Sequence, residues 1–309
     1  MSYALRSLIS AKMPAFRRMM VASLVFGVVA FSADMSSGQL QEIQTGQVFE
    51  SPGFFDLPGS LAYDAIRDRL ACADINRGIV YVFDLAERTF QAKGGERLLE
   101  NPCGLAFDPE GALYVSQENS SFLMCYGYGA ETPDSIALDS LTGTPGVKAR
   151  RLYIDKQRNI YIADRDHKAV YIVDGGGKPG RKISEKLRRP DGMVVLASGE
   201  ILVADKGVDP ILEFSPMGDF IRYLSRPESP TVQISLSASG LAVDQKGWIY
   251  TIDVTRAKIV WYDPTGVNKN EWSPSEFSFF PDDIAIDRYD NIYVSETSSG
   301  RIRVFRTVF

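Results

Sequence analysis

A short motif recurs six times between residues 60 and 287, and its spacing restricts the folds open to this chain. Each copy holds an apolar run that ends in Asp, or in Leu in one copy, followed by a turn and a second apolar run. Successive copies end 44, 47, 41, 48 and 43 residues apart, at Asp64, Asp108, Asp155, Leu196, Asp244 and Asp287. A period of this length is typical of structural repeats built from one small antiparallel sheet each.

The second run of each copy is short and rich in β-branched and aromatic residues, which predicts a strand. These second strands are expected at 70–74, 113–117, 160–164, 201–205, 249–253 and 292–296, with third strands at 79–83, 123–126, 170–173, 211–214, 259–262 and 302–305. Gly111, Gly199 and Gly247 sit where a tight hairpin needs a positive φ, and Arg158 and Asp290 fill that slot in two other copies. We therefore expect an all-β, six-bladed β-propeller with four-stranded blades.

The ends of the repeat region indicate how the ring closes. The last copy stops at Phe309 after its third strand, while an unassigned extended run lies ahead of the first copy at Gly46–Ser51. We expect this N-terminal run to supply the outer strand of the sixth blade. The predicted organisation is an N-terminal segment at 1–33, a linker at 34–45 and one propeller domain at 46–309.

The first 33 residues differ in composition from the repeats. Arg6, Lys12, Arg17 and Arg18 precede an uncharged apolar run from Met19 to Ala33. This run has 15 residues, fewer than the roughly 20 that a membrane span needs, and small residues at its end favour cleavage. We expect an export signal and a periplasmic or extracellular protein, the alternative being an uncleaved membrane anchor.

Charge and cysteine content restrict the partners. Removing residues 1–33 takes away four positive and no negative charges, so the net charge changes from −5 to −9. An acidic body argues against nucleic-acid binding, which rests on phosphate neutralisation. Cys72, Cys103 and Cys125 are odd in number, and we expect three buried thiols.

Two stretches carry a resemblance to a known family. Residues 101–115 and 240–250, which read Asn-Pro-Cys-Gly-Leu-Ala-Phe-Asp-Pro-Glu-Gly-Ala-Leu-Tyr-Val and Gly-Leu-Ala-Val-Asp-Gln-Lys-Gly-Trp-Ile-Tyr, resemble NHL repeats of the kind found in exported bacterial propellers. The resemblance extends over all six copies and implies a six-bladed propeller. It implies little about activity, since such rings serve mainly as binding platforms.

Two enzyme branches of related propellers imply metal sites. Zinc-dependent lyases of this type use several histidines, whereas this chain has one, His167. Calcium-dependent lactonases that resemble gluconolactonase use a Glu from the first blade, Asn residues and the Asp of a Pro-Asp-Gly turn. Pro190–Gly192 matches that turn, while the first-blade Glu is missing. Under this alternative the calcium ligands are Asp191, Asp282 and Asn101.

The starts of the first strands and the ends of the second strands share one side of the ring, which we call the top face. The two residues at each first-strand start are small in most copies. Copy three instead has Arg150 and Arg151, and copy six, expected across the ring, has Asp282 and Asp283. The channel mouth should thus be electrically polarised. Basic residues nearby extend the positive half: Lys148, Arg165, His167, Lys168, Lys186, Arg188 and Arg189.

Arginine forks match carboxylate and phosphate oxygens, so this sector is predicted to bind an acidic ligand or partner together with Asp191. The alternative is that these charges serve solubility. The polar residues that end the second strands recur in every copy, which favours caps of loop amides over catalysis. They are Asp74, Gln117, Asp164, Asp205, Asp253 and Glu296.

Our leading hypothesis is a monomeric, exported, non-catalytic propeller without a cofactor. It binds a protein, a peptide or an anionic small ligand on its top face, and it meets a membrane only through an uncleaved N-terminal segment. The rival hypothesis is a calcium-dependent lactonase or hydrolase with its metal at the channel mouth.

Overall fold

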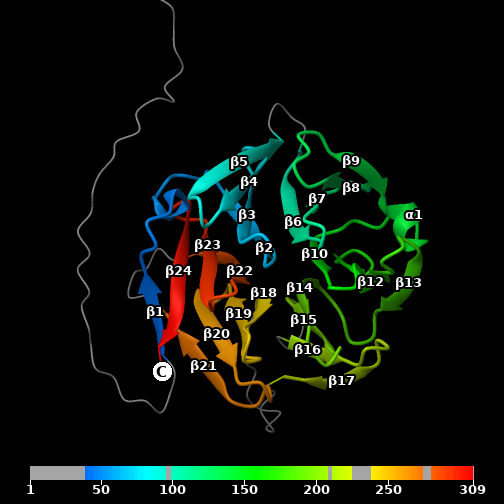
Figure 1. The fold of residues 1–309 in the computed structure, drawn as a ribbon. Coiled ribbons are helices and arrows are strands. Elements are labelled where there is room, and N and C mark those ends of the chain that lie inside the picture. Colours follow the sequence, from blue (N-terminus) through cyan, green and yellow to red (C-terminus); the bar gives the residue numbers. More distant parts are fainter. Residues whose placement is uncertain (1–38, 95–98, 208–210, 225–237, 274–279, 309) are drawn as a thin grey trace, which may run out of the picture. The chain divides into compact units, whose positions relative to one another are not determined.

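The computed structural model of the protein describes residues 39–94, 99–207, 211–224, 238–273 and 280–308. They form six four-stranded antiparallel sheets whose innermost strands each contact those of the two neighbouring sheets, so that the sheets close into a ring (Figure 1). The predicted six-bladed propeller is thereby confirmed. The expected export segment at 1–33 lies outside the described residues. Among the residues that are described, no helix has the length and apolar character required to cross a membrane.

Each blade runs from its inner strand to its outer strand in chain order, except the last. The first blade contains β2 (Pro58–Asp64), β3 (Arg69–Asp74), β4 (Ile79–Asp84) and β5 (Thr89–Gly94). The second contains β6 (Pro102–Phe107), β7 (Leu113–Gln117), β8 (Phe122–Tyr126) and β9 (Asp134–Ala137), followed by helix α1 (Leu138–Thr142). The third contains β10 (Arg151–Ile154), β11 (Ile160–Asp164), β12 (Ala169–Val173) and β13 (Pro179–Ile183).

The remaining blades repeat this order. The fourth contains β14 (Pro190–Val195), β15 (Ile201–Asp205), β16 (Ile211–Phe214) and β17 (Phe220–Tyr223). The fifth contains β18 (Ala238–Val243), β19 (Ile249–Asp253), β20 (Lys258–Tyr262) and β21 (Lys269–Trp272). The sixth contains β22 (Pro281–Ile286), β23 (Asn291–Glu296), β24 (Arg301–Val308) and, as its outer strand, β1 (Gln39–Ile43).

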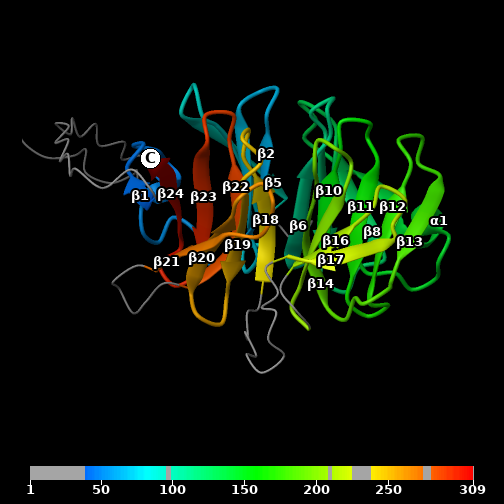
Figure 2. The same ribbon diagram turned by 90° about the horizontal axis from the view of Figure 1, so that it is seen from below.

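The hairpins that join the first two strands of each blade lie on the face opposite the top face, which we call the hairpin face, and Figure 2 shows the strands crossing the disc between the two. Every such hairpin has one residue with positive φ: Asp68, Gly111, Arg158, Gly199, Gly247 and Asp290. The residue with positive φ is the third after the end of the motif in five copies and the fourth in the first blade, whose hairpin is one residue longer. Arg158 and Asp290 adopt the left-handed conformation that was predicted for their slot.

The core consists of apolar layers between neighbouring blades. One layer joins Leu123 of the second blade to Ile162 and Val173 of the third, all fully buried. Each blade lies between two neighbouring blades that cover both of its faces. Its second strand can therefore be buried along its whole length, as β11 and β15 are. Burial of these strands stabilises the ring and holds the inner strands at a defined distance from the channel axis.

The ring closes through an N-terminal strand, but not the one that was predicted. β1 pairs with β24 in antiparallel register from Gln39 opposite Val308 to Ile43 opposite Val304. The propeller thus begins inside the expected linker at 34–45. Gly46–Ser51 instead contains a 3-10 turn, η1 (Val48–Glu50), because the Glu50 carboxylate accepts the backbone N–H groups of Thr45 and Gln47 at 3.0 Å and bends the chain.

We expect Leu40→Ala to lower the free energy of unfolding by about 2–5 kcal/mol, because Leu40 is buried in the closing layer between the fifth and sixth blades. The matched control is Gln41→Ala, since Gln41 is the next residue on β1 and is exposed. Urea unfolding of both variants measures the difference. Equal stability of the two variants would contradict the observed register of β1.

Candidate functional site

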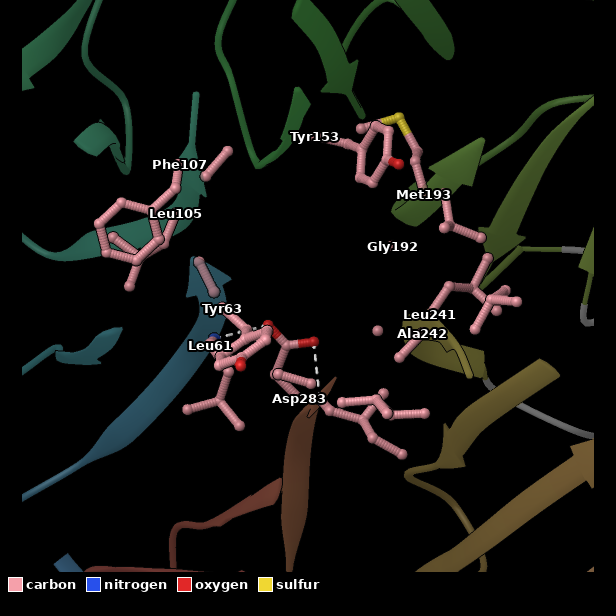
Figure 3. Close-up of a pocket in the computed structure, with 18 of the residues that line it drawn as sticks. Leu61, Tyr63, Leu105, Phe107, Tyr153, Gly192, Met193, Leu241, Ala242 and Asp283 are labelled. Atoms are coloured by element: carbon pink, nitrogen blue, oxygen red, sulfur yellow. Dashed lines mark hydrogen bonds between the residues drawn. The ribbon is translucent and has the colours of Figure 1, made fainter. Parts of the chain in front are cut away.

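The channel holds a cavity of about 590 Å³ lined by the inner strands of all six blades. Its walls are mostly apolar, and Figure 3 shows Tyr63, Phe107, Tyr153 and Met193 around the open space. The cavity reaches from the level of Arg151 near the top face to residues of the hairpin face. The two ends of the channel therefore differ in chemistry.

A buried ion cluster crosses the channel at its top end. The Arg151 guanidinium of the third blade donates from Nε to Asp191 Oδ1 at 3.0 Å, from Nη1 to Asp283 Oδ2 at 2.9 Å and from Nη2 to Asp282 Oδ2 at 2.8 Å. Asp191 comes from the fourth blade, while Asp282 and Asp283 come from the sixth. One guanidinium thus joins three blades, including two that face each other across the ring.

Strand irregularities place these aspartates. β14 and β22 each shift register against their neighbour near the top, between Pro190 and Met193 and between Pro281 and Ile284. Such bulges turn side chains away from the regular alternation of a strand. β10 pairs with β11 without a shift, so that Arg151 extends from a regular strand to meet carboxylates presented by irregular ones.

Close approach of the inner strands is required beside this cluster. Gly240 has a φ of +64°, and a Cβ atom there would lie 2.3 Å from Asp283 Oδ1. A Cβ atom on Gly192 would lie 2.6 Å from the backbone of Gly240. Only glycine fits both positions, so the recurrent small residues at the strand starts make room for the ion cluster.

Two further cations bind Asp191. Both Arg165 Nη2 and Lys206 Nζ contact Asp191 Oδ2. Burial would raise the pKa of Asp191, but Lys206, Arg151 and Arg165 outweigh burial and hold the pKa well below its ordinary value. Burial lowers the pKa of Lys206, and Asp191 opposes that change only in part. Asp191 is therefore the anionic centre of the cluster.

The two aspartates of the sixth blade differ. Burial opposes ionisation of Asp282, yet Arg151 and Lys206 keep its pKa below the ordinary value. Burial raises the pKa of Asp283, and Arg151 compensates only partly. Asp283 also accepts the Leu61 backbone N–H at 2.8 Å and the Ser60 hydroxyl at 3.1 Å. Its carboxylate consequently ties the sixth blade to the first as well as to the third.

These contacts correct the prediction of a polarised channel mouth. The arginine and aspartate pairs do face each other across the ring, but Arg151 is buried and forms ion pairs with both Asp282 and Asp283. The distance across the mouth is short enough for one side chain to span it. Arg151 thus closes the top of the channel, and each of its three guanidinium nitrogens donates to an aspartate of the cluster.

The other predicted residues lie around this cluster on the third and fourth blades. Arg150 and Lys148 are half-buried, while Arg188 and Arg189 are exposed. His167 is half-buried, and its Nδ1 lies 2.7 Å from Asp164 Oδ2. Lys206 was missed by the sequence analysis, although its position directly after the strand-ending Asp205 was a usable signal.

The capping role is confirmed for five of the six strand-ending residues. Asp74 accepts the Asp56 and Leu57 backbone N–H groups, and Asp205 accepts those of Arg188 and Arg189. Glu296 differs, since it binds hydroxyl and guanidinium side chains. The other three bind backbone N–H groups in the same way as Asp74 and Asp205: Gln117, Asp164 and Asp253, with Asp164 capping Lys148.

The thiol prediction holds for two cysteines of three. Cys72 and Cys103 are buried and Cys125 is half-buried, and all three are free. Burial raises the pKa of the Cys72 thiol, and the negative charge of Asp74 raises it further. A protonated, buried thiol is a poor nucleophile.

The residues proposed for calcium do not fit that ion. Both Asp191 oxygens already contact cationic groups, which occupy the space where a calcium ion would need to coordinate. Asn101 is exposed on the surface with its backbone carbonyl accepting the Glu118 N–H. Within the described ranges, no cluster of three or more His, Cys, Asp or Glu side chains has a geometry suited to a metal.

Comparison with known proteins first defines the class, a six-bladed propeller. A catalytically inactive virginiamycin B lyase from Staphylococcus aureus superposes with a TM-score of 0.66 at 9% identity, over 88% of this chain and 100% of that one. A gluconolactonase from Xanthomonas campestris superposes with a TM-score of 0.66 at 13% identity, over 88% and 91%. At such identities the likeness concerns the fold alone.

A sequence likeness then points to NHL-repeat proteins. NHL-repeat-containing protein 4 of Mus musculus is 28% identical over 121 residues, which are 39% of this chain and 87% of that protein. The human protein of the same name is 28% identical over 107 residues, 35% of this chain and 85% of that one. No protein-family model matches the chain. The NHL resemblance of the repeats is thus supported at low identity.

We expect Arg151→Met to lower the free energy of unfolding by about 3–5 kcal/mol, because it leaves buried carboxylates without their main counter-charge. The pKa of Asp283, already raised, should rise further. A carboxyl whose pKa is raised in the folded state binds protons more tightly there, so the variant should gain stability as the pH falls from about 7.5 to about 5. Thermal unfolding at both pH values measures this.

The control for this prediction is Arg158→Met. Arg158 is 41% exposed on the hairpin face and pairs with Glu110 at 2.7 Å and with Asp108 at 3.4 Å. Asp108 keeps its hydrogen bond from the Ala112 backbone N–H, so loss of Arg158 should cost about 1 kcal/mol. A similar loss in both variants, or no difference in pH dependence, would argue against the ion cluster as the closure of the channel.

We also expect the melting temperature to be the same in calcium as in chelator. A calcium concentration of about 1 mM is suitable, because weak extracellular calcium sites bind near that concentration. Bound calcium would stabilise the folded state by mass action. Calorimetric titration provides the second measurement. A calcium-dependent rise in melting temperature would restore the lactonase alternative.

Proposed function

We propose that the protein is an exported, non-catalytic propeller that binds an acidic group of a protein, peptide or small ligand at its top face. The observation that carries this proposal is a pair of buried guanidinium N–H groups. Arg150 Nε and Arg165 Nε have no hydrogen-bond acceptor within the described part of the chain. A buried donor without an acceptor costs about 1–3 kcal/mol, which an external carboxylate or phosphate oxygen would recover.

Local charge agrees with this proposal. The channel mouth holds four cations, Arg150, Arg151, Arg165 and Lys206, and three carboxylates, Asp191, Asp282 and Asp283. The pKa of Arg165 lies below its ordinary value. Burial is the main cause, and the positive charges of Arg150 and Arg151 add to it, while Asp191 opposes the change. A positive surplus in a partly buried place is stabilised by an additional anion.

Exposed arginines can extend the contact outward. Arg188 and Arg189 follow each other at the start of the fourth blade, and their backbone N–H groups are fixed by Asp205. Their side chains are exposed and free to turn toward a partner. Guanidinium groups on an ordered loop bind carboxylates at a lower entropic cost than groups on a mobile segment.

The case against catalysis rests on the residues themselves. His167 is the chain's one histidine, and its ring nitrogen is held by Asp164, which also caps the loop N–H groups of Asp166 and His167. The thiol of Cys72 is buried. Within the described residues the channel mouth thus presents an ion cluster, and a nucleophile with an adjacent base is not found there.

We expect the triple variant of Arg150, Arg188 and Arg189 to Ser to bind a fluorescein-labelled hexaglutamate peptide at least about tenfold more weakly, because a hydrogen bond to a charged group contributes about 1.5–3 kcal/mol. The salt dependence of binding should flatten as well. Fluorescence anisotropy over a range of salt concentrations measures both effects. Arg151 is left in place because it is buried in the ion cluster.

The matched control changes Lys178, Arg181 and Lys182 to Ser. These residues carry the same charge, are exposed and lie in or beside β13 of the third blade, away from the mouth. Its affinity for the peptide should remain near that of the unmodified protein. Equal weakening in both triple variants would show that overall charge, and not the mouth, determines binding.

A further inference from the structure

We propose that the other end of the channel is a second ligand site, which takes a small amphipathic molecule with an apolar body and an anionic head. The body would fill the cavity from the hairpin face, and the head would lie at the rim beside Lys156. This site is separate from the top-face site, because the Arg151 cluster closes the channel between them.

The deep end of the cavity offers no recognition of an anion. Each of the three guanidinium nitrogens of Arg151 already donates to an aspartate. Asp283 is likewise occupied by Ser60, Leu61 and Arg151. A buried polar network that is internally satisfied presents little to a ligand. The deep end therefore limits how far a ligand can enter and does not bind its anionic head.

The walls favour an apolar body. The half-buried rings of Tyr63 and Phe107 lie on one side of the cavity, and the half-buried ring of Tyr153 lies across from them beside Met193 (Figure 3). The Tyr63 hydroxyl donates to Asp68 at 2.7 Å, which leaves the ring faces to contact a ligand. Water in such a space gains few hydrogen bonds, so apolar groups displace it favourably.

The rim favours an anionic head. Asp244 and Asp287 line the cavity mouth, but their carboxylates accept N–H groups of their own turns, at 2.9 Å from Lys246 and 2.8 Å from Tyr289. Lys156 also lines the mouth, is exposed and has no hydrogen-bond or ion-pair partner among residues 39–308 where these are described. Arg288, the other cation at the rim, pairs with Asp68 at 3.0 Å, so Lys156 is the rim cation to which an anionic head can pair.

Size and surroundings agree with a small molecule. A volume of about 590 Å³ lies inside the range of roughly 300–1,000 Å³ that is usual for small-ligand pockets. Ile66 and Tyr289, which neighbour the lining residues Ala65 and Arg288, are 64% and 60% exposed on the same face. Apolar side chains around the mouth would guide an amphipathic molecule inward.

The test is a series of saturated linear carboxylates from hexanoate to decanoate and the alcohols of equal length, in calorimetric titration against the full chain. Affinity should rise about fourfold for each added CH₂, the fold-change that corresponds to about 0.8 kcal/mol. The carboxylates should bind more tightly than the alcohols. Lys156→Gln should remove that head-group preference, whereas the control Lys186→Gln, an exposed lysine ahead of the fourth blade, should retain it.

Two variants block the cavity from different walls, so that the test survives if one of them fails to fold. Val243→Trp and Ile286→Trp each enlarge a half-buried lining residue, and either folded variant should weaken decanoate binding at least tenfold. Affinity that is independent of chain length, or unchanged in both folded variants, would overturn the proposal. So would the absence of binding by any probe, which would point instead to insertion of a partner's side chain.

The same series separates this site from the proposed function. The triple variant of Arg150, Arg188 and Arg189 to Ser should bind decanoate as the unmodified protein does. Decanoate should also fail to displace labelled hexaglutamate. If decanoate binding is lost in the arginine variant and kept in the tryptophan variants, the carboxylates bind at the top face and the second site is wrong.

Discussion

The ion cluster around Arg151 is the interaction on which the channel depends. One guanidinium joins carboxylates from the fourth and sixth blades, and Asp283 continues the connection to the first. Buried ion pairs add little net stability, because desolvation offsets much of their attraction. What they add is specificity, since the inner strands must approach at one distance for all three contacts to form. Gly192 and Gly240 permit that approach.

The cluster also divides the channel into two environments. Above it, Arg150 and Arg165 leave guanidinium donors without acceptors among the described residues. Below it, apolar and aromatic side chains line a cavity that ends at a rim containing Lys156. A ring with an open channel would offer one continuous site. A ring with a closed channel offers two faces that can bind different chemistry independently, and the low-identity resemblance to other propellers does not decide which face is used.

Closure of the ring follows a different principle from closure of the channel. β1 adds backbone hydrogen bonds to β24, and Leu40 fills the layer beside Trp261 and Phe305. This pairing removes an exposed strand edge and links the beginning of the described chain to its end. The turn that follows is held by Glu50, and Phe49 packs against Phe83 and Tyr293 with ring centroids 5.0 and 6.1 Å apart. The N-terminal region thus stabilises the first and sixth blades together.

The sequence alone determined the repeat, the number of blades, the second strands such as Ile160–Asp164 and the capping role of residues such as Asp205. These features are local, because a strand period and a turn act over a few residues and recur in every copy. The tertiary structure decided the rest. Whether Arg151 faces solvent or crosses the channel depends on the width of the ring and on the bulges in β14 and β22. The choice of Gln39–Ile43 over Gly46–Ser51 as the closing strand depended on pairing with a strand more than 250 residues away. The apolar cavity arises only where six inner strands converge. Neither the closing strand nor the cavity is therefore encoded in any single repeat.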